Sequence, residues 1–194
     1  MRRFRRLVGI SILVFVAVVI SFHLMGLPSL SLLGTTIQTS PSSDIQQPPN
    51  QMQLSDFAQR VLSRTNDYRA QFGCPPLVLN SILMGTAQEH SDEMVLHDFV
   101  GHQSFDGTTP WDRIYHAGYH YSLVAENVAW GQTTPEQVVD VWFNETPPND
   151  LHRQNILNCQ LHDMGLGYAY IADLNGRKIQ AHTYWTQDFG KVFT

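Results

Sequence analysis

The chain lacks the short motifs that identify several large enzyme classes. Its 194 residues contain no His-Glu-x-x-His protease motif, no Gly-x-Ser-x-Gly elbow, no phosphate-binding P-loop and no dinucleotide-binding glycine fingerprint. The only two cysteines, Cys74 and Cys159, do not form a Cys-x-x-Cys pair, which disfavours dithiol redox and zinc-thiolate chemistry. Any chemistry must therefore come from side chains that are dispersed along the sequence.

Basic residues are also scarce, and they are unevenly placed. Of the 12 lysines and arginines, four (Arg2, Arg3, Arg5 and Arg6) stand in the first six positions, leaving eight against all 17 acidic residues. The body of the chain therefore carries a net charge of −9. Such an acidic body has no counterion-release drive toward nucleic acid, and anionic lipid head groups would repel it. Nucleic acid is thus not expected as a partner.

One long uncharged apolar run is present, from Leu7 to Met25, directly behind the basic cluster. About 20 apolar residues span a bilayer, and flanking positive charge stays on the cytoplasmic side. Residues 1–27 therefore predict a signal anchor or a cleaved signal peptide, with the rest of the chain outside the cytoplasm. The segment after the run has no Ala-x-Ala cleavage site, which favours a retained membrane anchor; a secreted form remains the alternative.

Two further segments follow the apolar run. Residues 28–52 are rich in Ser, Thr, Gln and Pro and predict a disordered linker. Residues 53–194 form the predicted folded domain. In an oxidising compartment an even cysteine count favours a disulfide between Cys74 and Cys159, worth about 4 kcal/mol for a loop of about 85 residues. Two buried free thiols are the alternative.

The domain begins with helical patterns and ends with strand patterns. Apolar spacing predicts helices over 54–72 and 80–96, and capping signals predict helices over 109–117, 134–145 and 150–157. Two β-rich runs follow, joined at 174–177 by a segment with Asn-Gly, a strong hairpin signal. Helices followed by a hairpin indicate an α+β fold.

Four ionisable residues stand out among aromatics, glycines and amides: His102, Glu126, Glu145 and His152. Two imidazoles and two carboxylates suit a divalent-metal or acid–base pocket. Spacing alone does not bring them together, and each also has a structural interpretation, such as a surface loop for His102. Glu145 ends a predicted helix, where its charge opposes the helix dipole, so a compensating partner is expected.

The short sequence motifs around these residues, taken in order, resemble those of the CAP superfamily (cysteine-rich secretory proteins, antigen five and pathogenesis-related proteins), in an exported bacterial-type form. The matching motifs are NDYRAQFGCPPL, AQEHSDEM, FVGHQSFDGTTPWDRI, AENVAWG, VWFNE, HRQNIL, MGLGYAY and YWTQDFG. The resemblance implies an α–β–α sandwich with a small three-stranded antiparallel sheet between helical layers. It also implies that His102, Glu126, Glu145 and His152 share a shallow cleft that can bind a divalent metal, often zinc.

Two departures from the family pattern concern the cleft. Leu151 precedes His152 where relatives often have glycine, which can narrow the cleft. Glu145 is present although compact bacterial members lack it, and the connection from Glu145 to His152 is longer than theirs.

Three functions fit this resemblance. The first is an extracytoplasmic binding module whose cleft takes a metal together with a lipid, cell-envelope or protein ligand. The second is a metal-assisted hydrolase of peptides or the cell envelope, in which Glu126 or Glu145 is the base. The third is a structural or adhesion domain on a membrane stalk. A binding module is favoured over an enzyme.

Overall fold

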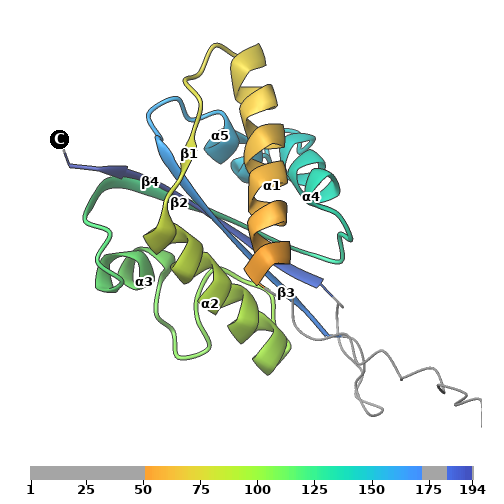
Figure 1. Cartoon of the computed structure of the whole chain (residues 1–194), viewed down its shortest axis with the longest axis vertical. Coiled ribbons are helices and arrows are strands. Elements are labelled where there is room, and N and C mark those ends of the chain that lie inside the picture. The colour runs from red at the N-terminus through yellow and green to blue at the C-terminus, as the bar shows by residue number, and fades with distance from the viewer. Residues whose placement is uncertain (1–50, 172–182, 194) are drawn as a thin grey trace, which may run out of the picture. The chain divides into compact units, whose positions relative to one another are not determined.

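The structure is a computed structural model that describes residues 51–171 and 183–193. Helices and strands are interspersed along this part of the chain (Figure 1). The elements are α1 (Gln51–Gln71), β1 (Val78–Leu79), α2 (Ser81–His97), α3 (Pro110–His116), β2 (Tyr121–Trp130), α4 (Pro135–Phe143), α5 (Leu151–Ile156), β3 (Asp163–Tyr170) and β4 (Thr183–Val192). The α+β class expected from the sequence is confirmed.

The strands of the described residues form one sheet in the order β1-β3-β4-β2. The β3–β4 and β4–β2 pairs are antiparallel, as a three-stranded antiparallel sheet requires. The sheet differs from the expectation by a fourth strand, because the two residues of β1 pair in parallel with the start of β3. The predicted hairpin turn at 174–177 lies outside the described residues, but the strands on either side of it pair as expected.

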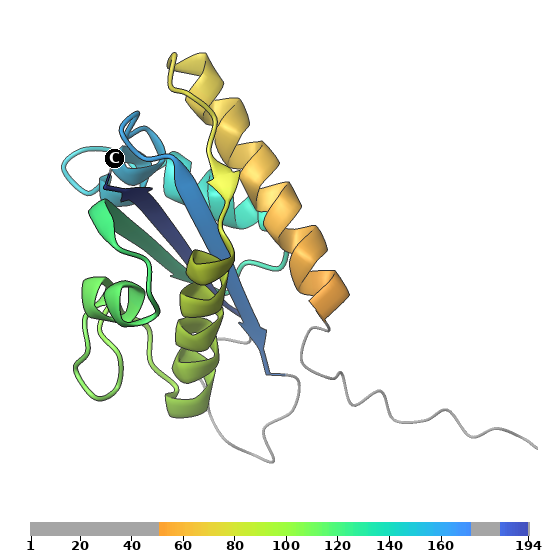
Figure 2. The same ribbon diagram turned by 60° about the vertical axis from the view of Figure 1, so that its left-hand side comes forward.

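Helices cover both faces of the sheet, which gives the expected α–β–α sandwich. Helices α1, α4 and α5 lie on one face, while α2 and α3 lie on the other (Figures 1 and 2). On the first face Phe57 of α1 stacks on Trp185 of β4, with ring centroids 5.7 Å apart. On the second face the Thr86 hydroxyl of α2 donates to Asp188 of β4 over 2.6 Å.

Local signals predicted the helix ends well. The Asn80 side chain accepts from the amides of Ile82 and Leu83 and caps α2, and Thr134 caps α4 by accepting from the amide of Gln137. Two boundaries differ from the prediction. Helix α1 already begins at Gln51, inside the predicted linker, since a first helical turn can form without burying its side chains. Helix α4 ends at Phe143 rather than near Glu145.

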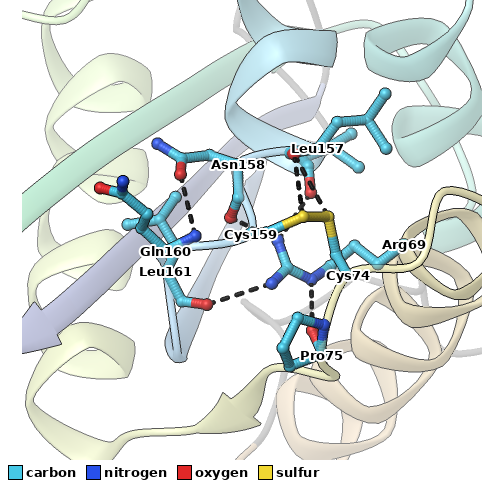
Figure 3. The surroundings of a disulfide bond; sticks show 9 residues. Arg69, Cys74, Pro75, Leu157, Asn158, Cys159, Gln160 and Leu161 are labelled. Atoms are coloured by element: carbon cyan, nitrogen blue, oxygen red, sulfur yellow. Dashed lines mark hydrogen bonds between the residues drawn. A yellow bond between two sulfur atoms is a disulfide. The ribbon is translucent and has the colours of Figure 1, made fainter.

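The predicted disulfide between Cys74 and Cys159 is present, with the two Cα atoms 4.7 Å apart. Beside it the fully buried guanidinium of Arg69 donates to the carbonyl oxygens of Pro75, Ile156, Asn158 and Leu161 (Figure 3). Burial lowers the pKa of Arg69. The disulfide and Arg69 together fasten the segment behind α5 to the end of α1, and so fix the helix that carries His152.

No helix within residues 51–171 and 183–193 is long and apolar enough to cross a membrane. The predicted signal anchor at 1–27 lies outside the described residues, as does most of the predicted linker.

Candidate functional site

A cavity of about 580 Å³ opens between the two helical layers at the β2 side of the sheet. Its walls come from three places: the segment from His102 into α3, the middle of β2, and the connection from α4 into α5. The lining residues are His102, Pro110, Trp111, Val124, Ala125, Glu126, Glu145, Pro148, Asn149, Leu151, His152 and Asn155. All four residues singled out in the sequence therefore line one cleft.

Glu126 holds His102 from the β2 strand. The Nδ1 atom of His102 lies 2.8 Å from Glu126 Oε1, and the Glu126 side chain is only 1% exposed. Arg113 of α3 donates from Nη2 to the other carboxylate oxygen over 2.5 Å. A buried carboxylate needs such a charged partner, because isolated burial of its charge is costly.

The loop that carries His102 is tied to both neighbouring helices. Arg113 Nη1 donates to the carbonyl oxygen of His102 over 2.9 Å. From α2, His90 Nε2 lies 2.7 Å from the carbonyl oxygen of Gly101, and Glu93 accepts from the amide of Phe105 over 2.9 Å. His90 is thus a fully buried residue of α2 that anchors the loop.

Glu145 holds His152 from the other layer. Its Oε1 atom lies 2.6 Å from His152 Nδ1, and its Oε2 atom accepts from the His152 backbone amide over 3.1 Å. The compensating partner expected for Glu145 is therefore His152. Asp150 precedes α5 but does not cap it with its side chain, which accepts from Gln154 instead. Glu145 satisfies the first-turn amide, and its charge lies favourably at the start of α5.

The two imidazoles meet across the cleft, with ring centroids 6.2 Å apart. Both rings use Nδ1 for a carboxylate, and no bond from the described residues reaches either Nε2. Zinc–nitrogen bonds of about 2.0–2.1 Å place the centroids of two coordinating rings roughly 5–6 Å apart, so the two rings, at 6.2 Å, would have to approach slightly to share one ion. No group of three or more His, Cys, Asp or Glu side chains in the described residues is arranged to hold a metal.

Two asparagines join β2 to α5 under the cleft through hydrogen bonds. Asn155 of α5 donates to the backbone oxygen of Glu126 over 3.1 Å and to Asn127 Oδ1 over 2.9 Å. Asn127 of β2 donates in turn to the backbone oxygen of His152 over 3.3 Å. These bonds couple the strand that carries one site carboxylate to the helix that carries one site imidazole.

Asp188 is a site-associated residue that the sequence analysis missed. It lies on β4 directly opposite Glu126 and is 1% exposed. Burial raises the pKa of Asp188 well above its usual value, and the nearby charge of Glu126 raises it further. An acidic residue inside the otherwise uncharged run YWTQDFG was the available signal.

The rim of the cleft is apolar. Trp111 is 49% exposed on α3, and Leu151 is 68% exposed at the start of α5, opposite it. Trp142 and Trp185 belong to the core, whereas Trp130, at the end of β2, is 50% exposed. Leu151, whose side chain departs from the family pattern, forms part of the wall.

Fold and site together define a class: an α–β–α protein with two carboxylate-held imidazoles facing each other at the edge of its sheet. Residues 62–189 match the model of the CAP family, described as the cysteine-rich secretory protein family. The chain belongs to this family, as the resemblance of its motifs implied.

The chain is similar to bacterial proteins in sequence and in fold. The chain is similar to YkwD of Bacillus subtilis strain 168, 32% identical over 136 residues that make up 70% of this chain and 48% of that protein. An extracellular SCP-domain protein of Bacillus anthracis strain Ames has a TM-score of 0.60 at 24% identity, covering 72% of this chain and 42% of that one. An outer surface protein of Borrelia burgdorferi has a TM-score of 0.59 at 22% identity, covering 70% and 92% respectively. The chain spans about half the length of the curated relative it matches.

Proposed function

We propose that this protein is an extracytoplasmic binding module that holds a divalent metal, zinc before others, between His102 and His152, and that the same cleft binds a further ligand. The observation that carries the proposal is the pairing of two imidazoles from opposite helical layers, each held at Nδ1 by its own carboxylate. A hydrogen bond at Nδ1 fixes the ring and leaves Nε2 as the donor atom for a metal.

The donor chemistry suits zinc, copper or nickel more than calcium or magnesium, because the free donors are imidazole nitrogens. Two protein ligands leave coordination positions open for water or for part of a bound molecule. Protonation competes with metal at imidazole, so metal affinity should fall as the pH is lowered.

Binding is favoured over hydrolysis by the state of the two carboxylates. Glu126 is buried and already contacts His102 and Arg113, while Glu145 contacts the ring and the amide of His152. A general base must reach the proton that it removes. Both carboxylates are instead engaged in orienting the imidazoles.

The location outside the cytoplasm is part of the proposal. It is supported by the basic cluster and apolar run at 1–27 and by the disulfide, because disulfides persist in oxidising compartments. The further ligand would be a lipid, a cell-envelope component or a protein.

Calorimetric titration of the metal-free, full-length chain with zinc tests the metal site. We expect one zinc per chain for the wild type and loss of that binding in His102→Ala/His152→Ala. His97→Ala/His116→Ala is a matched control, since it removes two other histidines and should leave binding unchanged. Equal zinc binding by the wild type and the His102/His152 variant, or no binding by the wild type, would overturn the proposal.

A further inference from the structure

Among residues 51–171 and 183–193, no further strand pairs with β2, so the cleft runs along an edge of the sheet. Strand β2 is the last strand in the order β1-β3-β4-β2, and its residues Val124, Ala125 and Glu126 line the cavity. An edge strand presents backbone N–H and C=O groups that can pair with another extended chain. Only those backbone groups of β2 that point into the cleft can pair with a bound chain.

Hydrogen bonds to β2 show whether the backbone groups of each residue point toward β4 or away from it. The backbone oxygen of Glu126 accepts from Asn155 of α5, and that of Val128 accepts from Trp142 of α4. Neither donor belongs to β4. In the other direction, the amide of Gly131 donates to Thr183 at the start of β4. In an antiparallel pair, alternate residues point their backbone groups toward and away from the partner strand. The backbone N–H and C=O groups of the even-numbered residues of β2 therefore point away from β4.

This alternation places the backbone groups of Val124 on the open side. The pairing of β2 with β4 is regular from Leu123 onward, with its irregularity confined to Tyr121–Leu123, so the alternation extends to Val124. Unlike the oxygens of Glu126 and Val128, the C=O of Val124 accepts no hydrogen bond from the described part of the chain, and the N–H of Val124 donates none to it. The edge is thus sealed by side chains at one end and open at Val124.

The walls beside this open edge can hold side chains. Trp111 and Pro110 stand on the α3 side, and Leu151 and Pro148 stand on the α5 side. Side chains of an added strand alternate between the two faces of a sheet, so successive residues would meet one wall and then the other.

We propose that the cleft takes an extended peptide segment, added as a strand beside β2, with its backbone paired to the N–H and C=O of Val124 and its apolar side chains against Trp111 and Leu151. The proposal rests on the binding function proposed above and names the class of its ligand. It uses the β-strand addition mode, in which main-chain bonds provide affinity and flanking pockets provide specificity.

A peptide fits these features better than a lipid or an anionic glycan. A lipid tail would leave the backbone groups of Val124 and the polar imidazole floor without partners, which is costly once water is removed. An anionic glycan would be repelled by a chain whose body carries excess negative charge. A neutral or basic peptide backbone supplies one donor and one acceptor at the matching spacing.

The test uses a phage-displayed library of random linear decapeptides, panned on the full-length chain in detergent micelles, and a selected peptide that is then synthesised. We expect apolar residues at alternate positions and displacement of the Val124 amide signal in NMR spectra. Val124→Pro should weaken binding about tenfold, because it removes the outward N–H of an edge strand while leaving the bonds to β4 intact. Val124→Ala keeps the N–H and is the matched control.

A second series does not depend on the folding of a variant. Methylation of single backbone nitrogens along the selected peptide should abolish binding at the residue facing Val124 and should spare its two neighbours. Failure to select any peptide, equal effects at all positions, or binding only of glycan chains or lipid vesicles would overturn the proposal. Zinc titration of the same protein separates the two proposals: zinc binding without a peptide leaves the metal site standing.

Discussion

Glu126 and Asp188 lie directly opposite each other on β2 and β4, and their residues are only 5% and 1% exposed. Arg113 bonds to Glu126, and the Thr86 hydroxyl bonds to Asp188, but Asp188 Oδ1 has no partner among the described residues. Two buried carboxyl groups next to a single arginine favour one negative charge rather than two. Arg113 contacts Glu126, which also holds His102, whereas burial and the charge of Glu126 raise the pKa of Asp188.

This arrangement makes stability depend on pH through Asp188. Its pKa is raised on folding by burial and by the charge of Glu126. A raised pKa contributes stability that is present below the unfolded value of about 3.9 and is lost as the pH rises through the folded value. We expect Asp188→Asn to remove this pH-dependent contribution to stability. The melting temperature of the variant should therefore rise relative to that of the wild type as the pH rises from 4 to 8. Thermal melts followed by circular dichroism would measure it.

Asp56→Asn is the control for this series, because Asp56 is an exposed aspartate on α1. Its difference from the wild type should vary little over the same pH range. A difference between Asp188→Asn and the wild type that stays constant from pH 4 to 8 would contradict the assignment.

The Arg113–Glu126 pair should be costly to break from one side only. The two side chains are 11% and 1% exposed, and removing one partner of a buried pair typically costs about 3–5 kcal/mol. We expect Arg113→Met to lose about that much stability in urea unfolding followed by tryptophan fluorescence. Arg113→Met/Glu126→Gln should recover a large part, because no unpaired charge then remains.

Arg60→Met provides a matched comparison. Arg60 pairs with Glu136, which is 44% exposed, so its removal should cost about 0–1 kcal/mol. The same small cost for Arg113→Met, or a double variant no more stable than the single one, would count against a buried, charge-dependent pair.

Glycine at 165 is required by the packing of α2 on β3. A Cβ atom built there would collide with the backbone of Leu83 and Met84. We expect Gly165→Ala to destabilise the protein by about 1–3 kcal/mol or more, since backbone must move to make room. Gly85→Ala, in α2 itself, meets nothing within 4 Å and should instead stabilise by about 0.5–1 kcal/mol. Chemical denaturation of both variants would test the pair, and equal effects would show that space is not the cause.

Much of the fold could be predicted because its signals are local. Capping residues such as Asn80 and Thr134 act within one helical turn, and the β-rich runs that became β3 and β4 pair as predicted. Strand β2 was not predicted, because residues 126–129 are buried on both faces and show no alternation of polar and apolar residues. Strand β1 has only two residues and exists through its pairing with β3.

Only part of the site was predicted from the sequence. Resemblance to the CAP family identified His102, Glu126, Glu145 and His152, and all four line the cleft. Arg113 and Asp188 were not recognised, because their importance comes from contacts with Glu126 across α3 and β4. Such contacts depend on strand register and helix packing, which spacing along the chain does not reveal.

The sequence by itself determined the helices, the β-rich ends of the domain, the cysteine pair and the ionisable residues that characterise the family, because each is written in adjacent or regularly spaced residues. Tertiary structure alone decided that Glu126 shares its buried site with Asp188 and Arg113, that Glu145 rather than Asp150 caps α5, and that the cleft opens over Val124. These depend on which side chains are brought within hydrogen-bond distance, and only the packing of the two helical layers on a sheet of defined register sets those distances.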